Sequence, residues 1–323
     1  MNRPSRISFV LLALMFVLVV WLKLGAFLLA ALFGYLALQV FSFRRSKTLS
    51  VTLYFIAVIV IGAGMTYIAS LAYHTLSHIA EMSIPAMVGF AEKNGINLPF
   101  TDYESLKSTA LSEARAGITA IGRYARVVSF QTVLLLAGLV VAVSIFLNPS
   151  WTVDDRSQAA AANIYTEVAQ ELSIRFKNFY QCFAKVIGAQ IIISAINTVL
   201  TAVFLAGNGY PYSLLLICLV FLCGLIPIVG NLMSNILIVG VGFTLSPRTG
   251  IMALIFLVVI HKLEYLFNSK IIGIRINNPM WLMLTGLVVG DCLMGVPGMI
   301  LAPVVLYYIK LEASPYHFFP AKD

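Results

Sequence analysis

The sequence predicts an all-α integral membrane protein with about seven or eight transmembrane helices. Of its 323 residues, 60% are hydrophobic and only 11% are charged, whereas soluble domains carry about 25% charged residues. The apolar residues form runs of about twenty, which cross a hydrocarbon core of about 30 Å as helices and are too long for porin-type strands. Glycine and proline interrupt the apolar segments of the C-terminal half, which predicts broken or re-entrant helices there.

The expected elements fall into five regions along the chain. Region 1–73 holds three membrane segments at about 7–22, 25–43 and 51–73, and region 74–126 is an extracytoplasmic helical loop region. Region 127–182 holds a fourth segment at about 127–147 and a cytoplasmic amphipathic helix. Region 183–312 is the expected transport region, with apolar segments at about 183–206, 212–226, 228–245, 250–260 and 279–309, and 313–323 is a tail.

Both large loops carry helical patterns. Thr101, followed three residues later by Glu104, is a capping-box pattern, and apolar residues recur at helical spacing over 106–121. We expect this helix to dock on the membrane domain or on a neighbouring subunit. An apolar stripe over 164–179 predicts a second helix, which either lies in the cytoplasmic interface or packs on protein; its members are Ile164, Val168, Leu172, Phe176 and Phe179.

Lysine and arginine in the short loops predict the orientation. Arg3 and Arg6 precede the first segment and three more basic residues begin the 44–50 loop, whereas the turn between the first two segments holds only Lys23. The N-terminus is therefore expected in the cytoplasm, 74–126 outside, and 148–182 and 261–278 inside. The net charge of +8 reflects these basic loops, not a nucleic-acid partner. No small-residue cleavage site follows the first apolar run, so we expect a retained hairpin and a multi-pass protein of the bacterial inner membrane.

Two helix-breaking patterns lie at membrane depth. They are Leu225-Ile226-Pro227-Ile228-Val229-Gly230 and Gly295-Val296-Pro297-Gly298, the second followed by Pro303. A straight helix over 279–309 would be about 46 Å long, too long for one span, and the segment is too short for two spans and a turn. Broken helices are the best sequence pointer to a transporter's substrate site, although a proline kink that only shapes packing is the alternative for either break alone. With two breaks present, we expect both to meet near one cavity.

The order of motifs in the C-terminal part is typical of one family. The Ile226-Pro227-Ile228-Val229-Gly230 element is followed by Lys262-Leu263-Glu264, a basic linker at 269–275, Asn278-Pro279, Gly295-x-x-Gly298-x-x-x-x-Pro303 and Lys310. In order and spacing, residues from about 180 to 312 resemble the shared C-terminal region of the autoinducer-2 exporter (AI-2E) family, and the N-terminal segments fit it with weaker motifs.

The resemblance implies a transporter that exports or exchanges a small polar solute, and we expect a proton or sodium gradient to drive it. Sodium/proton antiport within the same family is an alternative, and the resemblance also implies a homo-oligomer such as a pentamer. A passive channel is the rival from another class. An intramembrane enzyme is disfavoured, because Asp291 has no second membrane aspartate and no G-x-S-x-G turn is present. The sequence has no P-loop, so ATP does not drive the chain itself, and we expect no enzyme activity and no cofactor.

Polar side chains in the apolar segments are candidate site residues, because they are costly in lipid. Asp291 either binds a cation or proton, or it caps the next half-helix or reaches the aqueous face. Glu264 is either a pathway residue or half of an interfacial ion pair. Asn231 and Asn235 share a helical face and are expected to bind solute. The full set of pathway candidates is Pro227, Gly230, Asn231, Asn235, Glu264, Asp291, Gly295, Gly298 and Pro303.

Two further polar patterns are explained without a solute or metal site. Gln190 and Asn197, seven residues apart, share one helical face and are expected to join helices by hydrogen bonds. His74, His78 and Glu81 could offer three metal ligands on one face, but an exposed helix end explains them better, and we expect no metal.

Overall fold

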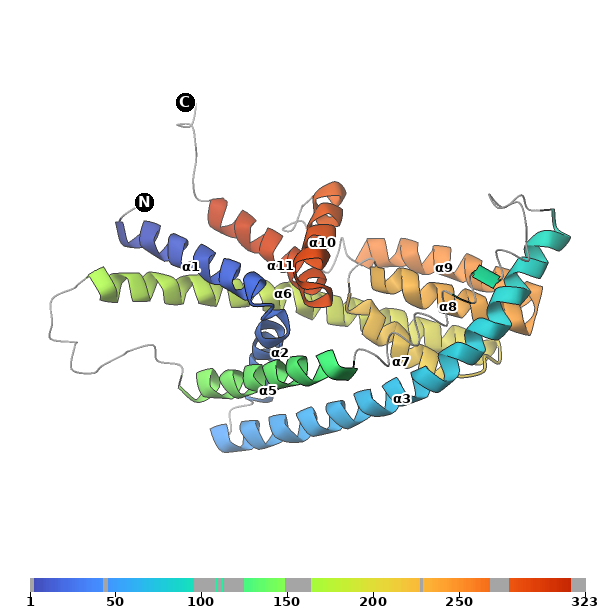
Figure 1. Cartoon of the computed structure of the whole chain (residues 1–323), viewed down its shortest axis with the longest axis horizontal. Coiled ribbons are helices and arrows are strands. Elements are labelled where there is room, and N and C mark those ends of the chain that lie inside the picture. The colour runs from blue at the N-terminus through green and yellow to red at the C-terminus, as the bar shows by residue number, and fades with distance from the viewer. Residues whose placement is uncertain are drawn as a thin grey trace, which may run out of the picture. The chain divides into compact units, whose positions relative to one another are not determined.

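The structure, a computed structural model, describes residues 3–42, 46–95, 108–109, 112, 125–148, 164–226, 229–267 and 279–314. Every regular element in these residues is an α-helix (Figure 1). Within the described residues, four stretches are long and apolar enough to cross a membrane, namely Arg3–Trp21, Lys47–Tyr73, Ile164–Gly207 and Val296–Ala313, and shorter apolar helices accompany them. The predicted all-α membrane fold is therefore confirmed.

The helices form two compact units that are interleaved along the sequence. Unit 1 consists of Met1–Ala57, Ser129–Gly188 and Ile276–Asp323, and unit 2 consists of Val58–Val128 and Ala189–Arg275. Two long helices contribute to both units, because α3 (Lys47–Lys93) changes unit after Ala57 and α6 (Ile164–Gly207) changes unit after Gly188. The five regions expected along the sequence stay a prediction.

Unit 1 combines helices from both ends of the chain with the first part of α6. They are α1 (Arg3–Trp21), α2 (Gly25–Phe41), α5 (Ala125–Leu147), α10 (Met280–Met294) and α11 (Val296–Ala313), with the start of α3. The ring of Phe179 on α6 contacts Phe16 of α1 and Tyr308 of α11, at centroid distances of 5.2 and 5.4 Å. Helices α1 and α11 therefore cover the same part of α6, although they lie at opposite ends of the sequence (Figure 1).

Unit 2 contains the rest of α3 and α6 together with α7 (Ser213–Gly224), α8 (Val229–Leu245) and α9 (Pro247–Phe267). Helix α8 packs on both α7 and α9 (Figure 1). The unit has an apolar core that includes Ile79, Leu205, Tyr210, Leu216, Val220, Ile238, Val241 and Phe243. Tyr210 lies in the turn before α7, and burial raises its pKa to about 12.

Two helices run further than the sequence analysis expected. Helix α3 continues past the predicted segment end at residue 73 to Lys93, with Pro85 inside it. Helix α6 begins at Ile164 and passes residue 183 without a break. No glycine or proline stands at either expected boundary, so the helix propagates beyond the apolar stretch. The stripe over 164–179 thus belongs to α6, and burial of its Val168 and Phe179 favours packing on protein.

Some predicted features lie outside the described residues. The helix expected over 101–121 falls almost wholly outside them, as do Pro227 and residues 268–278 of the basic linker. His74 and Glu264 lie in described helices, but their side chains are outside the described part.

Candidate functional site

The first predicted break lies in unit 2, where α7 ends at Gly224 and α8 begins at Val229. The last carbonyl groups of a helix have no donor within the helix, and in lipid they must find one elsewhere in the protein. Two side chains of α6 supply such donors. Gln190 Nε2 donates to the carbonyl oxygen of Gly224 at 2.6 Å, and Ser194 Oγ donates to that of Phe221 at 2.7 Å. These bonds fasten the end of α7 to α6 and confirm the helix-joining role predicted for Gln190.

The start of α8 closes on the same helix end. Gly230 is buried, and a side chain in its place would fall on the carbonyl oxygen of Cys223. A glycine is therefore required for the two backbones to touch. Gly224 of α7 packs closely on the side chain of Ser194, so both α6 and α8 approach the end of α7 at this break.

Six buried polar side chains lie on the two helices that contact the end of α7, and we call them the polar seam: Gln190, Ser194, Asn197 and Thr201 on α6, and Asn231 and Ser234 on α8. The four members on α6 recur every three or four residues and so share one helical face. Each of the six is at most 8% exposed. All of them are uncharged, and amides and hydroxyls recognise other molecules by hydrogen bonds.

Asn197 differs from its neighbours on the seam. Ser194 Oγ donates to a carbonyl of α7, and Ser234 Oγ donates to the carbonyl of Asn231 at 3.1 Å. Asn197 Oδ1 is buried, and no donor among the described residues lies within hydrogen-bond distance of it. Leaving a buried acceptor unpaired costs about 1–3 kcal/mol. This oxygen is therefore available to a donor on a bound molecule, and it does not take part in the helix joining expected from the sequence.

Two other predicted residues of unit 2 lie close to the seam in sequence. Asn235 is half-buried on α8, one residue beyond Ser234. Glu264 lies on α9, and its side chain is outside the described part. The solute-binding role of Asn231 and Asn235 stays a prediction.

The second predicted break, in unit 1, is the turn of a helical hairpin formed by α10 and α11. Gly295 has φ 65° and ψ −144°, a conformation that is essentially restricted to glycine. A side chain on Gly290 or Gly298 would fall on the backbone of the other residue, so the two legs touch directly. The legs have 15 and 18 residues, or about 22 and 27 Å. The predicted interruption of 279–309 is therefore confirmed as a hairpin.

The hairpin turn carries little polar chemistry. Asp291 lies one turn before Gly295, whose N–H donates to the Asp291 carbonyl at 2.7 Å, and the Asp291 side chain is exposed. Pro297 packs against Gly25 at the start of α2. Pro303 is buried inside α11, which continues through it.

The two breaks lie in different compact units, so the expectation that they meet near one cavity stays a prediction. Sequence reasoning found both breaks and the four amides but missed Ser194, Thr201 and Ser234. Hydroxyls are inconspicuous in apolar helices, because they commonly bond to a carbonyl of their own helix. The signal that could have revealed them was the three- or four-residue spacing of Ser194 and Thr201 from Gln190 and Asn197, and the three-residue spacing of Ser234 from Asn231.

Comparison with known proteins agrees with this architecture. The family model described as AI-2E family transporter matches residues 7–312. The chain is also similar to a Bacillus subtilis (strain 168) protein named "Putative transport protein YdbI", with 26% identity over 145 residues. That match covers 44% of this chain and 41% of the relative, so it spans less than half of the relative's length. Because the family match takes in both units and both helix breaks, the chain belongs to the AI-2E family of membrane transporters.

Proposed function

We propose that this transporter moves a small polar solute past the polar seam, as an exporter or exchanger driven by an ion gradient. The observation that carries the proposal is the buried Oδ1 of Asn197, which has no donor among the described residues and lies one helical turn beyond the Ser194 contact with the broken helix. Substrate sites of transporters lie where helices break at membrane depth. A solute that carries a hydroxyl or N–H donor would complete the hydrogen bond that the protein leaves open.

The other groups of the seam support this role by holding the break in place. Gln190 and Ser194 are engaged with α7, so they fix the geometry. Contact with the solute then falls to Asn197, with Asn231 and Asn235 as the partners expected from the sequence. Asp291 and Glu264 are the proposed carriers of the coupling ion, either a proton or sodium.

Sodium/proton antiport is the second candidate function. The seam offers amide and hydroxyl oxygens beside the C-terminal end of α7, and the carbonyl ends of broken helices coordinate sodium in other transporters. In this case the ion itself would occupy the place of the solute next to Asn197.

We also propose a cytoplasmic N-terminus in the bacterial inner membrane, with further copies of the chain as neighbours. Contacts of Arg175 with Ser5 and Glu312 put the start of α1, the early part of α6 and the end of α11 at one side of unit 1. Most of the apolar stretch Lys47–Tyr73 is uncovered in the described structure, although Ser50 and Tyr54 near its start are buried, which leaves the uncovered part for lipid or another copy. With the native cysteines replaced, Asn94→Cys should react with an impermeant maleimide in intact cells, and reaction only after permeabilisation would reverse the orientation.

A flux assay tests the transport proposal. The full chain is reconstituted into sealed vesicles, and efflux of a panel of radiolabelled small polar solutes is measured with a proton gradient, a sodium gradient or none. We expect gradient-dependent flux of at least one solute. Sodium movement without any solute would select the antiporter, flux that ignores both gradients would indicate a passive channel, and absence of all flux would contradict the proposal.

A further inference from the structure

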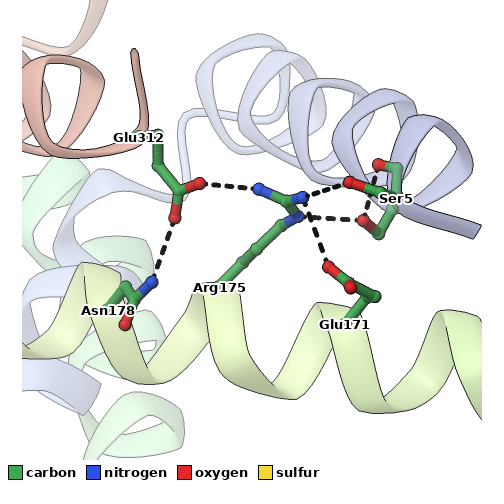
Figure 2. Close-up of polar contacts among 6 residues, drawn as sticks. Ser5, Glu171, Arg175, Asn178 and Glu312 are labelled. Carbon is green, nitrogen blue, oxygen red and sulfur yellow. Dashed lines mark hydrogen bonds and ion pairs between the residues drawn. The ribbon is translucent and has the colours of Figure 1, made fainter. Parts of the chain in front are cut away.

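A buried arginine lies at the centre of a polar cluster in unit 1 (Figure 2). The side chain of Arg175 on α6 is 5% exposed. Its Nε donates to Ser8 Oγ and its Nη2 to Ser5 Oγ, both on α1 and both at 2.9 Å. The ring of Phe9, also on α1, lies 3.4 Å from the guanidinium. One side of the guanidinium is therefore held by the first helix of the chain.

The other side of Arg175 is held by the last described helix. Nη1 donates to Glu312 Oε2 on α11 at 2.7 Å, and the second carboxylate oxygen of Glu312 accepts a hydrogen bond from Asn178 Nδ2 of α6 at 3.2 Å. The side chain of Glu312 is only 15% exposed. Both oxygens of Glu312 thus bond to α6 (Figure 2), and removing one partner of such a buried ion pair is strongly unfavourable.

Glu171 contacts the same guanidinium in a different way. It lies one turn earlier on α6, its Oε2 is 3.4 Å from Arg175 Nη2, and its side chain is 40% exposed. Exposed ion pairs contribute little. Glu171 and Glu312 therefore form a matched pair of carboxylates on one arginine, and of the two only Glu312 comes from another helix.

We propose that Arg175 and Glu312 form a latch that holds α11 on α6 in the conformation described here and opens in another conformation. A permanent helix contact is made at least as well by apolar packing, because a buried ion pair adds little over apolar residues of the same volume. An ion pair near the ends of α1 and α11 can instead open and close as water enters. Helix α11 is one leg of the Gly295 hairpin, so the latch sets the position of that hairpin. Arg175 is a positioning residue, and the role of the opening in transport rests on the proposed function.

The native cysteine Cys182 reports whether α11 lifts from α6. It is 2% exposed and lies seven residues after Arg175, on the same helical face. Phe179, which lies on the same stretch of α6, is covered by Tyr308 of α11. The other free cysteines, Cys218, Cys223 and Cys292, are replaced by alanine. The rate at which N-ethylmaleimide labels Cys182 in the full chain is then measured by mass spectrometry over a range of pH. The rate constants of the thiolate are compared between variants, because the Glu312 charge also acts directly on this thiol.

We expect Glu312→Gln to raise the labelling rate of Cys182 about tenfold, because the charge that holds α11 is removed while the shape is kept. Glu171→Gln is the matched control and should stay within about twofold, as for an exposed pair. Glu312→Asp keeps the charge but shortens the side chain, so it can no longer reach both Arg175 and Asn178 and should also raise the labelling rate, by less than glutamine does. It serves as a second variant if glutamine impairs folding, with monodisperse elution as the check. Equal labelling rates in the wild-type protein and in folded Glu312 variants would overturn the latch.

A cross-link tests whether the latch opens during transport. Asn178→Cys and Glu312→Cys, in a background without other cysteines, are bridged with a reducible bis-methanethiosulfonate. We expect flux to stop on cross-linking and to return on reduction, while each single-cysteine variant treated with the same reagent keeps its flux. Full flux in the cross-linked protein would refute the opening. If neither the wild-type protein nor any variant shows flux, the proposed function fails. The Cys182 labelling comparison still tests whether Glu312 holds α11 on α6.

Discussion

The two helix breaks look alike in sequence and are closed in different ways. At the Gly295 hairpin of unit 1, backbone meets backbone, because Gly290 and Gly298 leave no room for side chains between the legs. At the break between α7 and α8 in unit 2, Gly230 likewise meets the backbone of Cys223, but a third helix also takes part. Gln190 and Ser194 of α6 bond to the carbonyls at the end of α7.

This difference decides what each break can do. A turn closed by backbone contact alone presents few polar groups to a solute. A break that is held by polar side chains of a neighbouring helix has amides and hydroxyls beside it. Glycine and proline therefore locate a break along the chain, but the neighbouring helix determines its chemistry. The following substitutions test that distinction, in order of decreasing expected effect.

Gly298→Ala should have the largest effect on stability. Its new methyl group would fall on the backbone of Gly290, and overpacking of this kind costs about 1–3 kcal/mol, occasionally more. Thermal unfolding in detergent measures the loss. Gly62→Ala is the matched control, because nothing lies within 4 Å of the added atom and alanine favours the helix. Equal stability of the two variants would show that the hairpin legs do not touch as described.

Gln190→Leu should destabilise the protein at the break between α7 and α8, where side chains of α6 hold the end of α7. Leucine leaves the carbonyl of Gly224 without its donor, which costs about 1–3 kcal/mol for a buried group. The free energy of unfolding should fall by about that amount in the same detergent assay. A variant as stable as the wild-type protein would mean that α6 does not fasten the break.

Asn197→Leu, on the same face of α6, should reduce transport without reducing stability. The Oδ1 that it removes has no donor in the described protein, so stability should not fall. Flux should drop about tenfold, the equivalent of about 1.4 kcal/mol in solute binding. Thr198→Val, at the adjacent position, removes a hydroxyl that bonds only within its own helix and should leave flux intact. Loss of stability with full flux in Asn197→Leu would instead assign this amide to helix joining.

Much of this fold can be predicted from the sequence, because a helix that crosses the membrane needs a long apolar run and because glycine and proline mark where such helices break. The break at residues 225–230 and the hairpin at residues 279–309 both follow from those signals. The Arg175–Glu312 contact does not, since its partners are 137 residues apart and no local pattern pairs them. The continuity of α6 was missed for a related reason, because a hydropathy change at residue 183 does not end a helix that lacks a breaker.

Asp291→Asn should have little effect on stability and still decides what the hairpin contributes. The Asp291 side chain is exposed, so the substitution should change the free energy of unfolding by less than about 0.5 kcal/mol. Asparagine keeps the shape and removes the titrating group, so if Asp291 carries the coupling ion, flux should fall to its value without a gradient. The measurement is solute flux in vesicles with and without the proton or sodium gradient. Gradient-driven flux that survives in Asp291→Asn would remove Asp291 from coupling. The hairpin would then be a structural break, and solute recognition would stay with the polar seam, whose six side chains carry no ionisable group.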